Sequence, residues 1–229
     1  VINGLAQGGG LYVPEELPAL SLDEICALAR LPYAQRAAAI YKAFNVDLPD
    51  EAIDELMGRA YGDNFDDEAI CPITSLDEST HILELWHGPT CAFKDMALQM
   101  LPYLLTASLK KTGEEKTVCI LVATSGDTGK AALAGFADAP GTAITVFYPE
   151  GKVSQVQELQ MTTQAGSNVQ VAAVEGNFDD AQSAVKRIFG DRALAERLAG
   201  NSHVVLSSAN SINVGRRSEE RRVGKECLR

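Results

Sequence analysis

The chain has 229 residues, of which 46% are hydrophobic, and carries a formal net charge of -11; it is long enough to bury a core in one large or two modest domains. The acidic excess argues against binding to nucleic acid or to an anionic membrane surface, and no apolar run approaches the roughly 20 residues of a membrane helix. Five cysteines without C-x-x-C pairing or metal-ligand spacing indicate a reducing compartment, so we expect a cytoplasmic protein without a metal site.

The N-terminal part of the chain, residues 1–78, shows mainly helical patterns. Ser21 and Glu24 have the spacing of a capping box, which predicts a capped first helix. Two further helices are predicted at 34–44 and 50–60, the latter with the preceding proline as its first residue. We therefore predict a small helical region ahead of the rest of the fold.

A lysine stands at the start of the next helical pattern. A strand-like run at 81–86 leads into a turn at Gly88-Pro89, and apolar residues at helical spacing begin just after Lys94. The dipole of a helix disfavours a lysine at its N-terminus, so Lys94 either solvates the helix start, meets an anionic group or acts as a neutral nucleophile. Pro102 should kink or end this helix.

Residues 79–217 change to alternating strand and helix patterns. Apolar runs joined by single amphipathic helices predict a parallel, mostly buried sheet with right-handed crossovers. We therefore predict a three-layer α/β fold for this part of the chain. The predicted strands are 118–122, 143–148, 169–174 and 204–206, and the predicted helices are 130–137, 153–164 and 177–198, the last interrupted near Gly190.

A polar turn, Thr124-Ser125-Gly126-Asp127-Thr128-Gly129, joins the first of these strands to its helix. Its hydroxyls and N–H groups should converge at a helix N-terminus, where a carboxylate or a phosphate is stabilised. The P-loop and dinucleotide motifs do not fit its spacing. A tight turn without a ligand is the alternative interpretation.

Three stretches carry a family resemblance. His-Gly-Pro-Thr-x-Ala-Phe-Lys-Asp at 87–95 resembles the Schiff-base lysine motif of threonine synthases, which are pyridoxal-phosphate enzymes of the tryptophan-synthase-β fold type (fold type II). The turn at 124–129 resembles the loop that holds the amino-acid substrate in this fold type, and Ser-x-Asn-Ser-Ile-Asn-x-x-Arg at 208–216 resembles a third threonine synthase segment. The resemblance covers residues 4–216.

The resemblance implies a reaction and a set of site residues. Lys94 would bind pyridoxal 5'-phosphate covalently and serve as the catalytic residue, and Asp127 would lie beside the 3-oxygen of the cofactor ring. The reaction would convert O-phospho-L-homoserine and water into L-threonine and phosphate, the last step of threonine biosynthesis. The residues implied to bind substrate are Thr124, Ser125, Gly126, Thr128, Gly129 and Arg216.

The chain also resembles only part of the family's length. It begins without methionine, and the glycine-rich loop that binds the cofactor phosphate in the family is absent from it, so we expect an N-terminal fragment that is inactive by itself. The charged residues 218–229 do not resemble the family and are interpreted as a foreign scar.

Two alternatives to this function stay open. Another fold-type-II lyase or dehydratase acting on a small amino acid would share Lys94 and the turn at 124–129, and a truncated fragment would bind nothing tightly. His87 is either a proton carrier or a structural residue of its turn. The oligomeric state is open.

Overall fold

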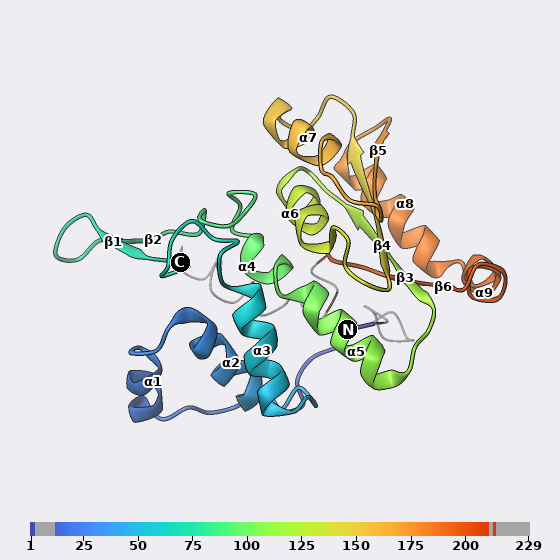
Figure 1. Ribbon diagram of the computed structural model, residues 1–229. Helices are drawn as coiled ribbons and strands as arrows, with labels where there is room; N and C mark the ends of the chain where they lie inside the picture. Colours follow the sequence, from blue (N-terminus) through green and yellow to red (C-terminus); the bar gives the residue numbers. More distant parts are fainter. Residues whose placement is uncertain (3–11, 211–212, 214–229) are drawn as a thin grey trace. The chain divides into compact units, whose positions relative to one another are not determined.

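The computed structural model describes residues 1–2, 12–210 and 213, which fall into two compact units (Figure 1). The helical unit is Val13–Phe93, and the sheet unit contains the other described residues. None of the helices in these ranges has both the length and the hydropathy that crossing a bilayer requires. The division near residue 78 proposed from the sequence stays a prediction.

The three predicted helices of the helical unit are confirmed. They are α1 (Leu22–Leu28), α2 (Tyr33–Ala43) and α3 (Asp50–Ala60). The predicted capping box is present, since the Ser21 hydroxyl accepts from the Glu24 N–H at 3.3 Å and the Glu24 carboxylate accepts from the Ser21 N–H at 2.7 Å. These two bonds satisfy backbone donors that the first turn of a helix leaves without partners.

Helices α2 and α3 pack together through one apolar face of α3. Pro49 precedes α3 as its N-cap residue, one position earlier than the sequence suggested. An ion pair of 2.8 Å between Lys42 and Asp54 joins the two helices at the surface. The buried side chains on and just after these two helices include Ala38, Ile53, Met57, Ala60, Tyr61 and Phe65.

A short antiparallel hairpin follows, with β1 (Ile73–Ser75) paired to β2 (His81–Leu83). The strand predicted at 81–86 is therefore shorter than expected. Leu83 pairs with Ile73, and the residue before Ile73 is Pro72, which accepts a hydrogen bond from Glu84 but has no N–H to return one. The ladder ends there for that reason.

His87 bridges this hairpin to the preceding loop. Its Nδ1 lies 2.6 Å from an Asp66 carboxylate oxygen, and its Nε2 lies 2.8 Å from a Glu84 carboxylate oxygen. The other oxygen of Glu84 accepts from the Thr74 hydroxyl at 2.6 Å. The hydrogen bonds to Glu84 and then to Asp66 raise the pKa of His87 above its ordinary value. With both ring nitrogens engaged, the structural interpretation of His87 is favoured over the proton carrier.

The sheet unit contains a four-stranded parallel sheet in the order β5-β4-β3-β6. The central pair is in a register that places Val118 opposite Thr142 and Ala123 opposite Phe147. All four strands were predicted from the sequence, and each is confirmed. They are β3 (Thr117–Ala123), β4 (Thr142–Pro149), β5 (Val169–Val174) and β6 (Val204–Ser207).

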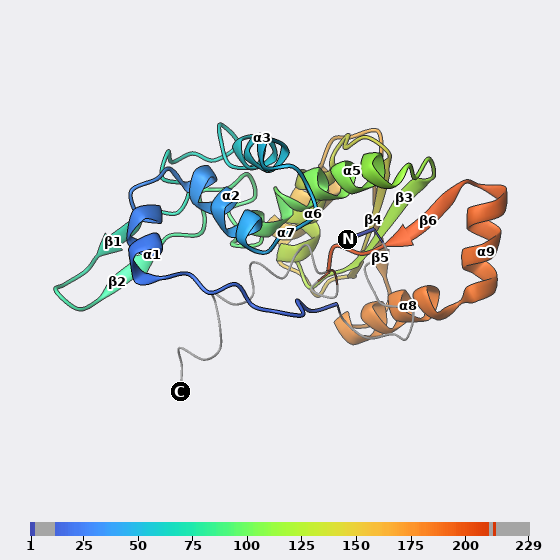
Figure 2. The ribbon, with the colours of Figure 1, turned by 90° about the horizontal axis from the view of Figure 1, so that it is seen from below.

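Helices cover both faces of this sheet, which confirms the three-layer α/β fold (Figures 1 and 2). Four helices pack on one face, and in Figure 2 the longest helix lies across the sheet from them. The first four are α4 (Asp95–Leu98), α5 (Leu101–Thr112), α6 (Asp127–Phe136) and α7 (Gln155–Thr162); the longest is α8 (Phe178–Gly190), and α9 (Arg192–Asn201) lies beside β6.

The two faces differ in how much apolar surface they bury. The face under α4 to α7 carries the larger core, and the face under α8 carries a smaller one. Alternate residues of β3 divide between them, as a strand with two buried faces requires. The larger core includes Leu98, Leu101, Val118, Ile120, Val122, Leu133, Phe136, Ile144, Val146 and Met161, and the smaller includes Leu121, Ala123, Ala181 and Val185.

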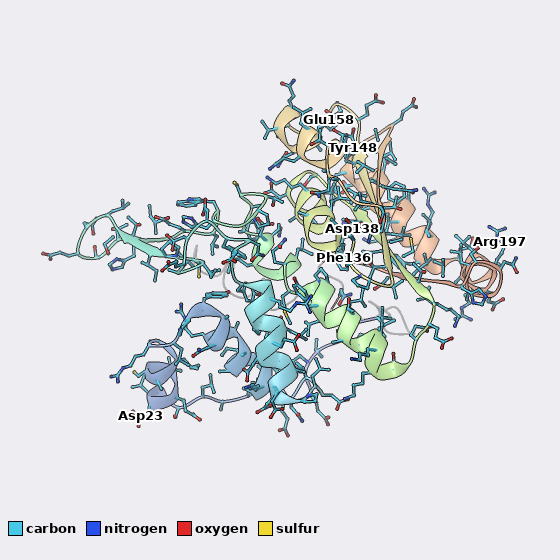
Figure 3. All side chains as sticks on the ribbon, viewed as in Figure 1. Asp23, Phe136, Asp138, Tyr148, Glu158 and Arg197 are labelled. Carbon is cyan, nitrogen blue, oxygen red and sulfur yellow. The ribbon has the colours of Figure 1, made fainter. Side chains whose placement is uncertain are left out.

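Two side-chain contacts join different segments of the sheet unit, and Figure 3 labels Tyr148, Glu158 and Asp138, which take part in them. The Tyr148 hydroxyl at the end of β4 donates to Glu158 of α7 at 2.9 Å. Asp138, just after α6, accepts from the backbone N–H and the hydroxyl of Ser167, both at 2.8 Å. The first of these contacts fixes α7 against the carboxyl end of β4.

The predicted break in the helix after Lys94 is present. Helix α4 ends at Leu98, and α5 begins at Leu101 with Pro102 in its first turn. A proline is tolerated there because the N–H it lacks would have no partner within the helix. The single predicted helix is therefore two helices.

Replacing His87 should remove a pH-dependent part of the stability of the helical unit. Because its folded pKa is raised, the contribution is fully present below the unfolded pKa of about 6.5 and is lost as the pH rises through the folded value. We expect His87→Gln to lower the urea midpoint at pH 6 and to change it much less at pH 9.

His81→Gln on the exposed hairpin is the matched control. It should leave the difference in urea midpoint between pH 6 and pH 9 as it is in the unsubstituted protein. An NMR titration of His87 gives the pKa directly. A midpoint at or below 6.5 would contradict the prediction, as would equal destabilisation by His87→Gln at both pH values.

Candidate functional site

Lys94 immediately precedes α4. It is the half-buried N-cap residue of that helix, and its carbonyl accepts from the N–H groups of Ala97 at 3.2 Å and Leu98 at 3.0 Å. Since α4 has only 4 residues, the dipole argument made from the sequence applies to a single turn and carries less weight. What fixes Lys94 is the burial of the turn that follows it.

Helix α4 touches α6 at backbone distance. Gly135 of α6 faces the carbonyl oxygen of Leu98, and a Cβ at this position would overlap that oxygen. A glycine is required here because only hydrogen fits between the two backbones. The contact brings the segment that begins at Lys94 against the helix that begins at the turn 124–129.

The turn enters its helix earlier than the sequence suggested. Helix α6 begins at Asp127 rather than at Lys130, so Asp127 to Gly129 form its first turn. Gly126 is the N-cap residue with φ 139°, in the region that favours glycine. The last three residues of the predicted substrate turn are thus helical.

The buried Thr124 side chain stabilises this turn. Its hydroxyl oxygen accepts from the N–H groups of Gly126 and Gly129, both at 2.9 Å. Two of the N–H groups expected to meet a substrate anion are therefore bonded to Thr124. Ser125 is the exposed residue of the turn, and its contact with substrate stays a prediction, as do those of Thr124 and Thr128.

Asp127 is held by two side chains that sequence reasoning missed. The amide nitrogen of Gln157 donates to its Oδ1 at 2.9 Å, and the Lys130 ammonium lies 3.4 Å from the same oxygen. Lys130 is only 8% exposed. Its spacing of three residues from Asp127 on one helix was visible in the sequence, whereas Gln157 lies on α7, and only the fold brings it to the turn.

The polar stretch before residue 213 supports the end of β3. The Asn210 amide accepts from the N–H of Ala123 at 3.3 Å and donates to its carbonyl at 3.0 Å, as a neighbouring strand would. The buried Asn213 donates to the carbonyls of Ser208 at 2.8 Å and Val1 at 2.9 Å. Arg216, the predicted phosphate ligand, lies outside the described residues, and so does the predicted scar at 218–229.

The Gly135 contact predicts that substitution by alanine changes the stability in opposite directions at two helical glycines. Gly135→Ala should destabilise the sheet unit by about 1 to 3 kcal/mol, because the added methyl overlaps backbone that cannot rotate away. Gly200→Ala in α9, where nothing lies within 4 Å of the added atom, should stabilise by about 0.5 to 1 kcal/mol. Urea unfolding of both variants measures the change in the free energy of unfolding. A change in the same direction in both variants would contradict the close contact at Gly135.

Comparison with known proteins places this arrangement in a family. Residues 1–61 match the family described as threonine synthase N terminus, and residues 76–220 match the family described as pyridoxal-phosphate dependent enzyme. The chain is 42% identical over 211 residues to the threonine synthase of Pseudomonas aeruginosa, covering 92% of this chain and 44% of that protein. It is 37% identical over 217 residues to the threonine synthase of Escherichia coli, covering 94% and 47%.

A solved structure agrees with these matches. The chain superposes on the pyridoxal-phosphate-bound threonine synthase of Brucella melitensis with a TM-score of 0.82 at 40% identity, covering 94% of this chain and 45% of that one. The chain thus spans less than half the length of these relatives. The resemblance found in the sequence is confirmed by these matches to threonine synthases, and the chain belongs to the pyridoxal-phosphate dependent enzyme family.

Proposed function

We propose that this chain supplies the lysine and the substrate turn of a cytoplasmic threonine synthase, which converts O-phospho-L-homoserine and water into L-threonine and phosphate. The observation that carries the proposal is the packing of α4, which begins just after Lys94, on α6, which begins within the turn 124–129. Relatives named threonine synthase, at 37–42% identity over more than nine-tenths of the chain, support the choice of reaction.

The donors present fit pyridoxal phosphate. Its aldehyde carbon requires a primary amine, and Lys94 offers one just before a buried helical turn. Its ring carries a 3-hydroxyl, which can donate to a fixed acceptor, and the Asp127 carboxylate is fixed by one hydrogen bond and one ion pair. The cofactor, when bound, supplies the electron sink that stabilises negative charge at the substrate Cα.

The residues of this chain would then orient the substrate and move its protons. Lys94 would hold the cofactor until the substrate amine displaces it, after which its Nζ would carry protons at the substrate Cα and Cβ while the γ-phosphate leaves. The exposed Ser125 and the N-terminus of α6 would bind an anionic group of the substrate. Thr124 would keep the turn in the shape that allows this.

Lys94 should be the residue that bears the cofactor. In the chain extended to the full length of its relatives, borohydride reduction followed by peptide mapping should place the cofactor on Lys94. Lys130 is the matched control, because it lies in the same layer but is ion-paired and 8% exposed. Labelling of Lys130, or of Lys110 and Lys111 at the end of α5, would contradict the assignment.

Ser125 should serve the substrate more than the cofactor. Ser125→Ala in the same full-length protein should weaken the use of phosphohomoserine by about 1.5 to 3 kcal/mol, the range for a lost hydrogen bond to a charged group, while the visible absorbance of the bound cofactor persists. Ser167→Ala removes a hydroxyl far from the turn and should leave kcat/KM unchanged.

The outcome of that experiment also separates the reaction from its alternative. Loss of cofactor absorbance with unchanged substrate use would reverse the two roles of the turn. Turnover of serine or threonine in place of phosphohomoserine by the unsubstituted protein would favour another lyase or dehydratase of the same fold type.

A further inference from the structure

The amide of Gln157 joins the cap of α7 to the turn at 124–129. Its oxygen accepts from the Ser154 N–H at 3.3 Å and from the Ser154 hydroxyl at 2.9 Å, and its nitrogen donates to Asp127 Oδ1 at 2.9 Å. A backbone N–H can only donate, so the oxygen of this amide must face Ser154. The nitrogen therefore faces Asp127, so the hydrogen bonds determine which end of the amide is the oxygen and which is the nitrogen.

Capping alone does not explain a glutamine at this position. Two other capping boxes among the described residues close with a carboxylate, Glu24 in α1 and Asp180 in α8. A carboxylate also interacts favourably with the positive end of the helix dipole. At α7 the closing residue is the neutral Gln157, which after capping has a donor left over, and this donor is the one bonded to Asp127.

Both identified partners of Asp127 meet the same oxygen. Oδ1 receives the Gln157 amide and faces the Lys130 ammonium at 3.4 Å, whereas no hydrogen bond to Oδ2 occurs within the described part of the chain. A carboxylate held by one oxygen presents the other in a fixed direction. The end of the Gln157 side chain also occupies the space where a Cβ of residue 126 would lie, so Gln157 supports the turn by contact as well.

The support behind Gln157 is rigid. Its neighbour Glu158 is bonded to Tyr148 at the end of β4, and Met161 of the same helix is buried in the larger core (Figure 3). Helix α7 is thus fixed to the sheet by contacts other than the Gln157 amide. Through its hydrogen bond, the amide of Gln157 fixes Asp127 relative to that helix.

We propose that Gln157 is a positioning residue for Asp127: oriented by Ser154 and assisted by Lys130, it holds one carboxylate oxygen and leaves the other in a fixed direction for a ligand that donates a hydrogen bond. The inference rests on the proposed function only in assigning a donor group of the bound cofactor or substrate as that ligand. The geometry of Asp127 itself is independent of the reaction.

The test measures the carboxyl carbon chemical shift of Asp127 by NMR in the 229-residue chain at one neutral pH. Gln157→Met removes both bonds of the Gln157 amide and adds no charge, and it should move this shift because the carboxylate loses a hydrogen bond. Ser154→Ala, which frees the amide to rotate, should move it in the same direction. Gln157→Glu keeps the cap but replaces the donor by a second carboxylate, and should also move it.

Asn177→Ala is the matched control. It removes the capping side chain of α8 in the same unit, and should leave the Asp127 carboxyl shift unchanged. A general loosening of the fold would move this shift in the control too. The Gln157→Met and Ser154→Ala variants keep the test decisive if Gln157→Glu does not fold.

An Asp127 carboxyl shift that is the same in the Gln157 variants as in the control would overturn the inference, whatever the activity. A shift confined to the Gln157 and Ser154 variants would establish it. If that shift occurs but Gln157→Met leaves both the pH profile of kcat/KM and the cofactor spectrum of the full-length protein unchanged, the positioning stands and the proposed role of Asp127 at the cofactor falls.

Discussion

The arrangement of the site depends on one backbone contact, where Gly135 of α6 meets the carbonyl of Leu98 in α4. Both helices begin at candidate site residues, α4 just after Lys94 and α6 within the turn 124–129. Their close approach on one face of the sheet therefore fixes the distance between lysine segment and turn through rigid elements. Side-chain contacts would leave more freedom, because side chains can change rotamer and backbone in a packed core cannot.

Much of the fold could be predicted because its signals are local. The capping residues Ser21 and Glu24, the position of Pro102 and the apolar runs of the four parallel strands each act within a few residues of sequence. The predictions failed where the chain meets a distant partner. The strand expected at 81–86 ends at Leu83 because Pro72, across the hairpin, cannot donate.

The candidate site shows the same division. The lysine and the turn were identified from their own residues, but the start of α6 at Asp127 was missed, because the bonds from Gly126 and Gly129 to the buried Thr124 hydroxyl form only when the turn closes. Gln157 was missed because it lies 30 residues from Asp127, on another helix. A pattern read along the chain gives no sign of such a bond.

The negative charge of Asp127 at the turn would oppose the binding of an anion there. The chain carries a net charge of -11, and Asp127 adds a negative charge at the N-terminus of α6, where a substrate anion is proposed to bind. Two like charges that lie close together repel each other. Lys130 at 3.4 Å offsets the charge of Asp127, and the Gln157 amide adds a neutral donor to the same oxygen. The dipole of α6 is then left to act on the substrate.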